Sequence, residues 1–158
     1  MIPGEGASVV FVERKPSVKT HSPVAVTGVG FGHEKATVTS EEPLSGLGLA
    51  AAMRAALAEA RVAMHEVDFR LSDVTGESYG FKEQSLALSR LLRVRRETLP
   101  LWHNADCIGD TGAAAGIGHL IRANHAFQAG YAPGSRAACY TSSVPGDRSV
   151  AVVEMRSE

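Results

Sequence analysis

The sequence predicts an α/β domain in which helices pack against a mixed five-stranded sheet. Short runs of β-branched and aromatic residues alternate along the chain with longer segments whose apolar residues recur at helical spacing. Such alternation is typical of strands joined by crossover helices. The length of 158 residues fits one domain over residues 1–158, and the 44% apolar content is enough for a core without metal or disulfide support.

Two strand-like runs open the chain. Residues 7–13 (ASVVFVE) are β-branched and aromatic, and residues 23–31 (PVAVTGVGF) alternate valines with small residues. Gly28, Gly30 and Gly32 fall in or beside the second run, where glycine indicates a bend or a closely approaching backbone.

Helices and strands then alternate. Leu49, Met53 and Leu57 recur at helical spacing in the first helical segment. Helices are predicted over residues 45–64, 81–94 and 110–128. Strands are predicted over residues 67–71, 99–103, 136–141 and 149–155, the last two as a candidate hairpin. Six runs are therefore strand-like, of which the sheet is expected to hold five.

Charge and composition exclude several classes of function. Sixteen Lys and Arg against seventeen Asp and Glu give a net charge of −1, whereas nucleic-acid-binding domains usually carry a basic excess. No apolar run approaches the length of a membrane span, and the N-terminus lacks the order of a signal peptide. Cys107 and Cys139 are too few for a disulfide framework or a zinc site and are expected to be buried, unreactive thiols. We expect a soluble cytoplasmic protein without metal or cofactor.

The third predicted helix opens with the glycine-rich stretch GDTGAAAGIG from Gly109. Free N–H groups at a helix start can hold a phosphate. The stretch matches neither the dinucleotide-binding nor the P-loop pattern, and Asp110 in it would repel an anion. Close packing of another element against this small-residue segment is the favoured interpretation.

Three motifs occur in a fixed order: GEGASVVFVE from Gly4, DVTGESYGFKE from Asp73 and IGDTGAAAG from Ile108. In order and spacing they resemble the C-terminal half of the β-ketoacyl synthases, condensing enzymes of the thiolase-like fold. There the segments read GEGA before a strand, HGTGT, and K-x-x-x-GHT-x-GAAG. The resemblance covers residues 4–154 and implies a thiolase-like half-domain.

The departures from these motifs fall on the family's functional positions. The histidine of HGTGT corresponds to Asp73, the histidine of GHT to Asp110, and the lysine five residues before it to Ala105. In the family the two neutral imidazoles donate hydrogen bonds to a thioester oxygen, whereas an ionised aspartate only accepts. Two carboxyls that share one proton could still donate, and two that meet unpaired would repel each other as the pH rises. Further candidate pocket residues are Thr75, His103, Cys107 and Thr111.

The resemblance also bears on partners. The family's nucleophilic cysteine lies in an N-terminal half that this chain does not match, and the small-residue helix would be exposed if that half were missing. We therefore expect an N-terminal ketosynthase-like half or a second copy as partner, and the start at MIPGEGA favours a fragment, a cleaved product or a shortened reading frame. An acidic acyl carrier protein is a further candidate partner for four arginines, although a solvated helix end explains them more simply. These are Arg90, Arg93, Arg95 and Arg96.

Three functions remain open at this point. The first is a catalytically degenerate ketosynthase-like subunit that acts as a binding or scaffolding partner. The second is a β-ketoacyl synthase-type acyltransferase whose active site is completed by the missing N-terminal half. The third is an acyl-chain or small-ligand binding protein, which would show an apolar channel ending near Asp73 and Asp110.

Overall fold

The computed structural model describes residues 2–14 and 24–156. The strands are β1 (Val24–His33), β2 (Phe69–Ser72), β3 (Leu101–His103), β4 (Arg136–Ser142) and β5 (Asp147–Met155). The helices are α1 (Leu47–Ala60), α2 (Ser78–Leu91), α3 (Ala105–Ile108) and α4 (Ala115–Gln128). Two short 3-10 helices, η1 (Met64–Glu66) and η2 (Gly112–Ala114), complete the set.

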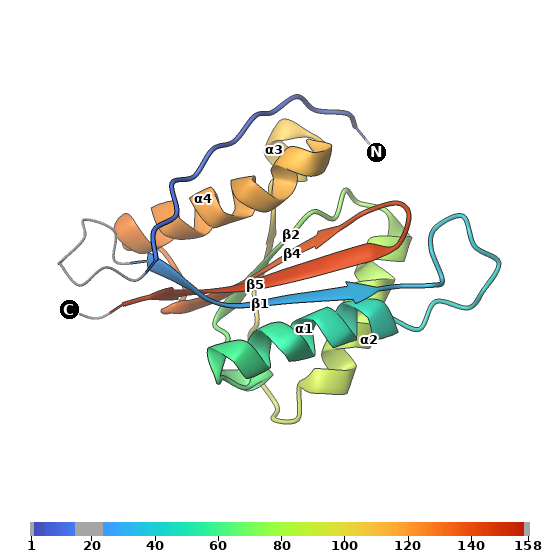
Figure 1. Ribbon diagram of the computed structural model, residues 1–158, viewed down its shortest axis with the longest axis horizontal. Coiled ribbons are helices and arrows are strands. Elements are labelled where there is room, and N and C mark those ends of the chain that lie inside the picture. Colours follow the sequence, from blue (N-terminus) through green and yellow to red (C-terminus); the bar gives the residue numbers. More distant parts are fainter. Residues whose placement is uncertain (1, 15–23, 157–158) are drawn as a thin grey trace.

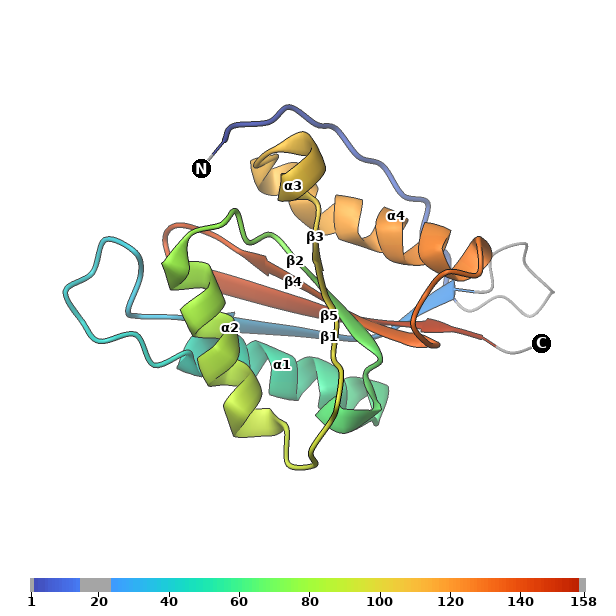
Figure 2. The same cartoon turned by 180° about the vertical axis from the view of Figure 1, so that it is seen from behind.

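The strands form one mixed sheet in the order β1-β5-β4-β2-β3. β1, β5 and β4 pair antiparallel, and β4, β2 and β3 pair parallel. Helices α1 and α2 cover one face of the sheet, and α3 and α4 lie on the other (Figure 1). Seen from behind, β3 lies at the near edge and leads up to α3 (Figure 2). The predicted five-stranded mixed sheet and the β4–β5 hairpin are confirmed.

The glycines of β1 set the distance between this strand and α1. An added Cβ at Gly28, Gly30 or Gly32 would lie 2.1, 2.0 or 2.1 Å from a carbonyl oxygen of α1. A side chain at any of these positions would force the helix away from the sheet. The prediction that a backbone approaches these glycines closely is therefore confirmed, and the approaching backbone is that of α1.

Each face of the sheet has its own core. On the α1 side, Val150 and Val152 of β5 and Tyr140 of β4 pack against the buried residues of α1. On the α4 side, Phe69 and Leu71 of β2 pack with a set drawn mostly from α4 and β4. That set is Ala123, Phe127, Ala137, Cys139 and Val153. Because strand side chains alternate between faces, neighbouring residues of β4 and β5 serve opposite cores.

A buried ion pair fixes the start of α2 against the β4–β5 hairpin. Arg148 Nε donates to Glu83 Oε1 at 2.8 Å, and Arg148 Nη2 lies 3.1 Å from the hydroxyl oxygen of Tyr79. Gln84 Nε2 donates to the buried Ser72 hydroxyl at the end of β2. These contacts hold both ends of the loop between β2 and α2, which carries Asp73.

The predicted strand over residues 7–13 is wrong within the described structure. Residues 5–14 pair with no strand, and Val9 and Phe11 are 89% and 88% exposed. The segment instead runs alongside α4 (Figure 1). It is tied down near its start, where Gly4 N–H donates to the Asp110 carbonyl and Asp110 N–H to the Ile2 carbonyl. Its β-branched composition is that of a strand, but a strand also needs a partner strand, and this segment runs beside α4 instead of along an edge of the sheet (Figure 1).

Helix boundaries differ from the prediction where the backbone leaves the helical region. The helix predicted over 45–64 ends at Ala60 because Arg61 adopts a left-handed conformation, with φ of 59°. The helix predicted over 110–128 consists of η2 followed by α4, which begins only at Ala115, since Gly112 has φ of 54°. The short helix α3, which precedes the predicted start, was not predicted. The remaining predicted elements are shifted by one to three residues, and Pro23, predicted to begin a strand, lies outside the described residues.

The glycine contact can be tested by a single methyl group. Gly30→Ala is expected to destabilise the chain by about 3 kcal/mol, because the new Cβ overlaps the Ala52 carbonyl of α1. Gly118→Ala, the same change in α4, brings its Cβ no closer than 3.5 Å to Asn104 Nδ2 and should shift the stability by less than about 1 kcal/mol. Urea unfolding of both variants gives the comparison, and equal effects would contradict the packing argument.

Candidate functional site

A small hollow lies where the C-terminal ends of β2 and β3 meet the turns that precede α4. Its volume of about 10 Å³ is close to the minimum that one water molecule needs. Ligand sites in sheets with parallel strands commonly lie at this end of the strands. The residues that line it are Ser72, Asp73, Asn104, Ala105, Gly109, Asp110, Thr111, Ala115 and His119.

Asp73 is held by the end of β4. Its Oδ2 accepts hydrogen bonds from the Ser142 backbone N–H at 2.6 Å and from the Ser142 hydroxyl at 2.9 Å. Burial raises the pKa of Asp73, and the two hydrogen bonds from Ser142 oppose this shift. The Asp73 carboxylate therefore links the β2–α2 loop to the end of β4, and its Oδ2 atom already accepts two hydrogen bonds.

Asp110 stabilises the turn that leads into α4. Its Oδ1 accepts the Gly112 N–H at 2.8 Å, and its backbone bonds to Ile2 and Gly4 of the N-terminal segment. The charge of Asp110 is not among the causes of the Asp73 pKa shift, which is dominated by burial. The carboxylates of Asp73 and Asp110 thus line the same hollow. Each accepts hydrogen bonds from donors elsewhere in the chain, so the two do not face each other as an unpaired couple.

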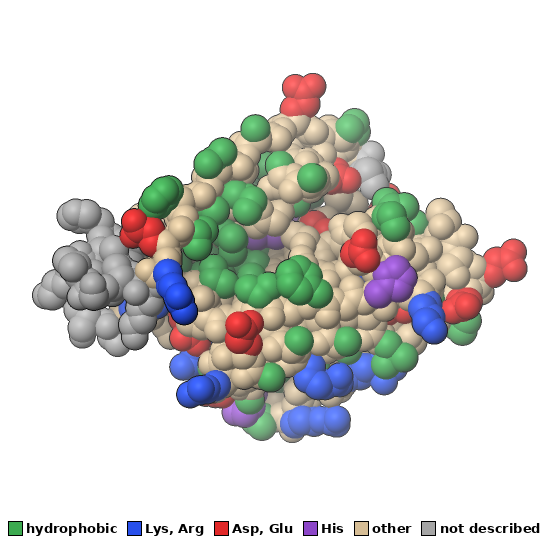
Figure 3. All heavy atoms as spheres, in the orientation of Figure 1, with side chains coloured by type: hydrophobic (Ala, Val, Ile, Leu, Met, Phe, Trp, Pro, Cys, Tyr) green, Lys and Arg blue, Asp and Glu red, His purple; other side chains and the backbone are tan. Residues whose placement is uncertain are grey.

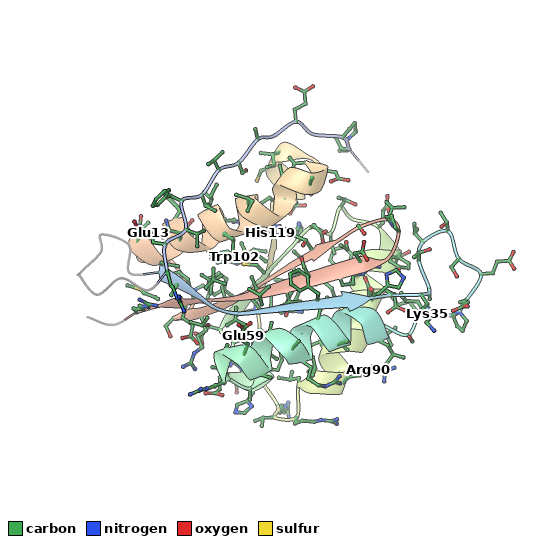
Figure 4. All side chains as sticks on the ribbon, in the orientation of Figure 1. Glu13, Lys35, Glu59, Arg90, Trp102 and His119 are labelled. Carbon is green, nitrogen blue, oxygen red and sulfur yellow. The ribbon has the colours of Figure 1, made fainter. Side chains whose placement is uncertain are left out.

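His119 lies between α4 and the sheet, at the hollow (Figure 4). The side chain is almost fully buried, and neither ring nitrogen makes a hydrogen bond among the described residues. Burial lowers its pKa to about 4, while the backbones of Ser72 and Tyr140 favour the charged form without completing a hydrogen bond. The imidazole is therefore neutral at pH 7.

The structure brings together only part of the predicted set. Asp73, Ala105, Asp110 and Thr111 line the hollow, whereas Thr75, His103 and Cys107 do not. His103 Nδ1 lies 3.0 Å from Asp106 Oδ1, at an angle unsuited to a hydrogen bond.

The two cysteines differ in their environment. Cys107, expected to be buried, is exposed on the short helix α3, so that expectation is wrong. A helix of four residues has no inner face large enough to bury it. Cys139 is buried as predicted, and burial raises its pKa to about 12.

Sequence reasoning missed Ser72, Asn104 and His119. The sequence gives no pairing signal for His119, because its nearest histidine, His125, lies six residues away, a spacing that does not share a helix face. One sequence feature could have indicated His119. It lies nine residues after Asp110, on the helix that follows this motif position, and that helix runs past the C-terminal ends of β2 and β3.

A second, larger feature is an apolar groove between α4 and the outer strands. It measures about 260 Å³ and shares no lining residue with the hollow. Hydrophobic side chains gather around it in Figure 3, next to the N-terminal segment. From β1, Val29 and Phe31 line the groove, and Phe31 is 76% exposed. From α4 and η2 come Ala113, Gly116, Ile117 and Leu120.

The described residues form neither a metal site nor a membrane span. In residues 2–14 and 24–156, no three His, Cys, Asp or Glu side chains converge as metal ligands. None of the helices in this part of the chain has the length and apolar character required to cross a bilayer.

The fold and site define a thiolase-like half-domain, and comparison with known proteins gives its family. Residues 24–138 match the family described as "Beta-ketoacyl synthase, C-terminal domain". The match covers more than half of the chain, which therefore belongs to the family of β-ketoacyl synthase C-terminal domains.

Known relatives are much longer than this chain. It is 30% identical over 134 residues to the PKS-NRPS hybrid synthetase ATPKS of Aspergillus niger, covering 79% of this chain and 7% of that protein. Among solved structures, the ishigamide ketosynthase/chain length factor has a TM-score of 0.70 at 20% identity, over 84% of this chain and 38% of its own. The ketosynthase ApeO with its chain length factor ApeC from Xenorhabdus doucetiae has a TM-score of 0.73 at 16% identity, over 86% and 40%. At sequence identities this low, the comparison shows that this chain and the two structures share a fold.

The buried position of Asp73 predicts a pH-dependent stability difference. A carboxyl whose pKa is raised on folding contributes stability that is present below its ordinary value of 3.8 and is lost as the pH rises through the raised value. Asp73→Asn removes this titration, so the unfolding free energy of the variant relative to the wild type should rise between pH 3.5 and pH 7. Urea unfolding at both values measures it. A difference that stays constant or falls would contradict the assigned burial.

Proposed function

We propose that this chain is a catalytically degenerate ketosynthase-like domain that acts as a binding or scaffolding partner. The observation that supports the proposal is the hollow at the three motif positions. Asp73, Ala105 and Asp110 supply two acceptors and a methyl group there, where the family resemblance implies two imidazole donors and a lysine. Ionised carboxylates oppose the negative charge that develops on a thioester oxygen during condensation.

The details of hydrogen bonding strengthen this interpretation. Asp73 and Asp110 already accept N–H groups of Ser142 and Gly112, so one carboxylate oxygen of each is bound within the chain and is not free for a substrate. Burial raises the pKa of Asp73, and the Ser142 hydrogen bonds oppose this shift. The hollow has room for about one water and not for an acyl group. The buried His119 is neutral, but its ring is enclosed between α4 and the sheet.

The partner that fits best is a second ketosynthase-like half. The apolar groove and the exposed side chains of Val9, Phe11 and Phe31 are apolar surface of the kind that commonly marks a site of protein interaction. This chain spans 38% and 40% of the ketosynthase structures described above, so the remaining length of such a protein could cover that face. A second copy of this chain is the other candidate for the same surface.

The alternatives receive less support. An acyl-chain binding protein would place an apolar channel next to Asp73 and Asp110, but the groove has no lining residue in common with their hollow. A split acyltransferase would require the partner to supply both the nucleophile and the missing donors. One structural neighbour is a ketosynthase in complex with a type II PKS acyl carrier protein. An acyl carrier protein is therefore a further candidate partner for this chain.

An activity assay separates the degenerate partner from the split enzyme. The chain is co-purified with the N-terminal half of a ketosynthase that carries the cysteine, and decarboxylation of a malonyl thioester is measured. We expect no activity above that of the N-terminal half alone. The matched control is the variant Asp73→His, Ala105→Lys and Asp110→His, which tests whether the complex can support donors at these positions. Turnover by the unmodified pair would overturn the proposal.

A further inference from the structure

Strand β1 forms one edge of the sheet, with β5 as its neighbour on the inner side (Figure 1). Residues of an antiparallel strand direct their N–H and C=O groups alternately to the two sides. The Glu34 N–H, just beyond β1, donates inward to the turn before β5, whereas the Val29 N–H donates to Glu59 Oε2 of α1. Phe31 and His33 follow Val29 at intervals of two residues. Their N–H and C=O groups therefore face outward as well, where no strand of the described residues pairs with β1.

The apolar groove lies on the same side of β1 as the side chains of Val29 and Phe31, which line it. In a pair of strands, residues directly opposite each other place their side chains on the same face. A strand added to the outer edge of β1 would therefore place every second side chain next to Val29 and Phe31, at the groove. Recognition by strand addition combines main-chain hydrogen bonds with pockets for alternate side chains, and this edge offers both.

Glu59 covers part of this edge in the isolated chain. It lies on α1 beside β1 (Figure 4), and its carboxylate accepts the Val29 N–H at 2.7 Å. Charged side chains at a sheet edge oppose unspecific pairing. An added strand would supply a carbonyl to Val29 and would leave the Glu59 carboxylate without this donor. A Lys or Arg on the α1-facing side of the added strand would restore a charged partner to Glu59.

We propose that the outer edge of β1 and the apolar groove bind an extended segment of a partner protein as a sixth strand beside the five of this sheet. The segment carries β-branched apolar residues at alternate positions, over the groove, and a basic residue between them, opposite Glu59. Neither residues 7–13 of this chain nor β1 of a second copy has a Lys or Arg, so a different polypeptide fits better. The proposal rests on the proposed role as a binding partner and specifies how a partner covers this face.

The test uses the full chain and a fluorescein-labelled synthetic peptide in which valines alternate with threonines and a lysine replaces the central threonine. Fluorescence anisotropy measures binding, and amide hydrogen exchange by NMR locates it. The peptide is expected to slow exchange of the Phe31 and His33 amides by at least about tenfold, because they become hydrogen-bonded. The Gly30 amide, which faces β5, should change by less than about twofold and serves as the internal control.

Two pairs of variants separate the backbone contact from the charge contact. Phe31→Pro removes the outward N–H and should bind the peptide at least about fivefold more weakly than Phe31→Ala, which loses the ring but keeps the donor. Replacing the lysine of the peptide by threonine should weaken binding to the wild type by about threefold and binding to Glu59→Gln by less than about 1.5-fold. Glu97→Gln loses the same charge at an exposed position between α2 and β3 and should keep the preference for lysine. Melting temperatures show whether each variant is folded, and the exchange measurement needs none of them.

Three results would overturn the proposal. The first is that the wild type does not bind the peptide. The second is binding without protection of the Phe31 and His33 amides, which would indicate attraction to the groove alone. The third is a wild-type dimer in which these amides are protected before peptide is added, which would assign the edge to a second copy. A chain that forms a complex with a ketosynthase half but does not bind the peptide contradicts the strand proposal and leaves the proposed function standing.

Discussion

The contact between the α1 backbone and the glycines of β1 is the constraint from which the exposed surfaces follow. Strand residues alternate between faces, so placing Gly28, Gly30 and Gly32 against α1 turns Val29 and Phe31 toward the α4 side. Helix α4 covers β4 and β2 but leaves these two side chains at the edge of an apolar groove. The tight side of β1 thus leaves Val29 and Phe31 on an open side, which the proposed partner would cover.

The same sheet separates two regions with different chemistry. At the strand ends, Asp73 and Asp110 are bound by N–H groups of their own chain, and the space between them is small. Along β1 and α4, the groove is apolar, wide and exposed. A domain that performed condensation would need donors and space at the first region. The available surface of this chain lies at the second region, and the proposed role as a binding partner rests on that difference.

The sequence predicts the fold well and the site only in part. Alternating strands and helices and the glycine pattern of β1 are local signals, and they predict the mixed sheet correctly. The strand predicted over residues 7–13 fails because strand formation depends on a neighbouring strand, which local composition does not reveal. His119 was missed because its burial results from packing between α4 and the ends of β2 and β4. The family motifs do locate Asp73, Ala105 and Asp110 at one hollow, since the resemblance carries three-dimensional information that spacing alone lacks.

The most direct test of the account is the solution mass of the purified chain, measured by light scattering with and without an equimolar N-terminal ketosynthase half. The open groove predicts that the wild type forms a defined complex with that half or with itself. Phe31→Asp, a change at an exposed position of the groove, should abolish the complex without lowering the melting temperature. A wild-type chain that stays a stable, monodisperse monomer in both samples would contradict the claim that this face is built to be covered.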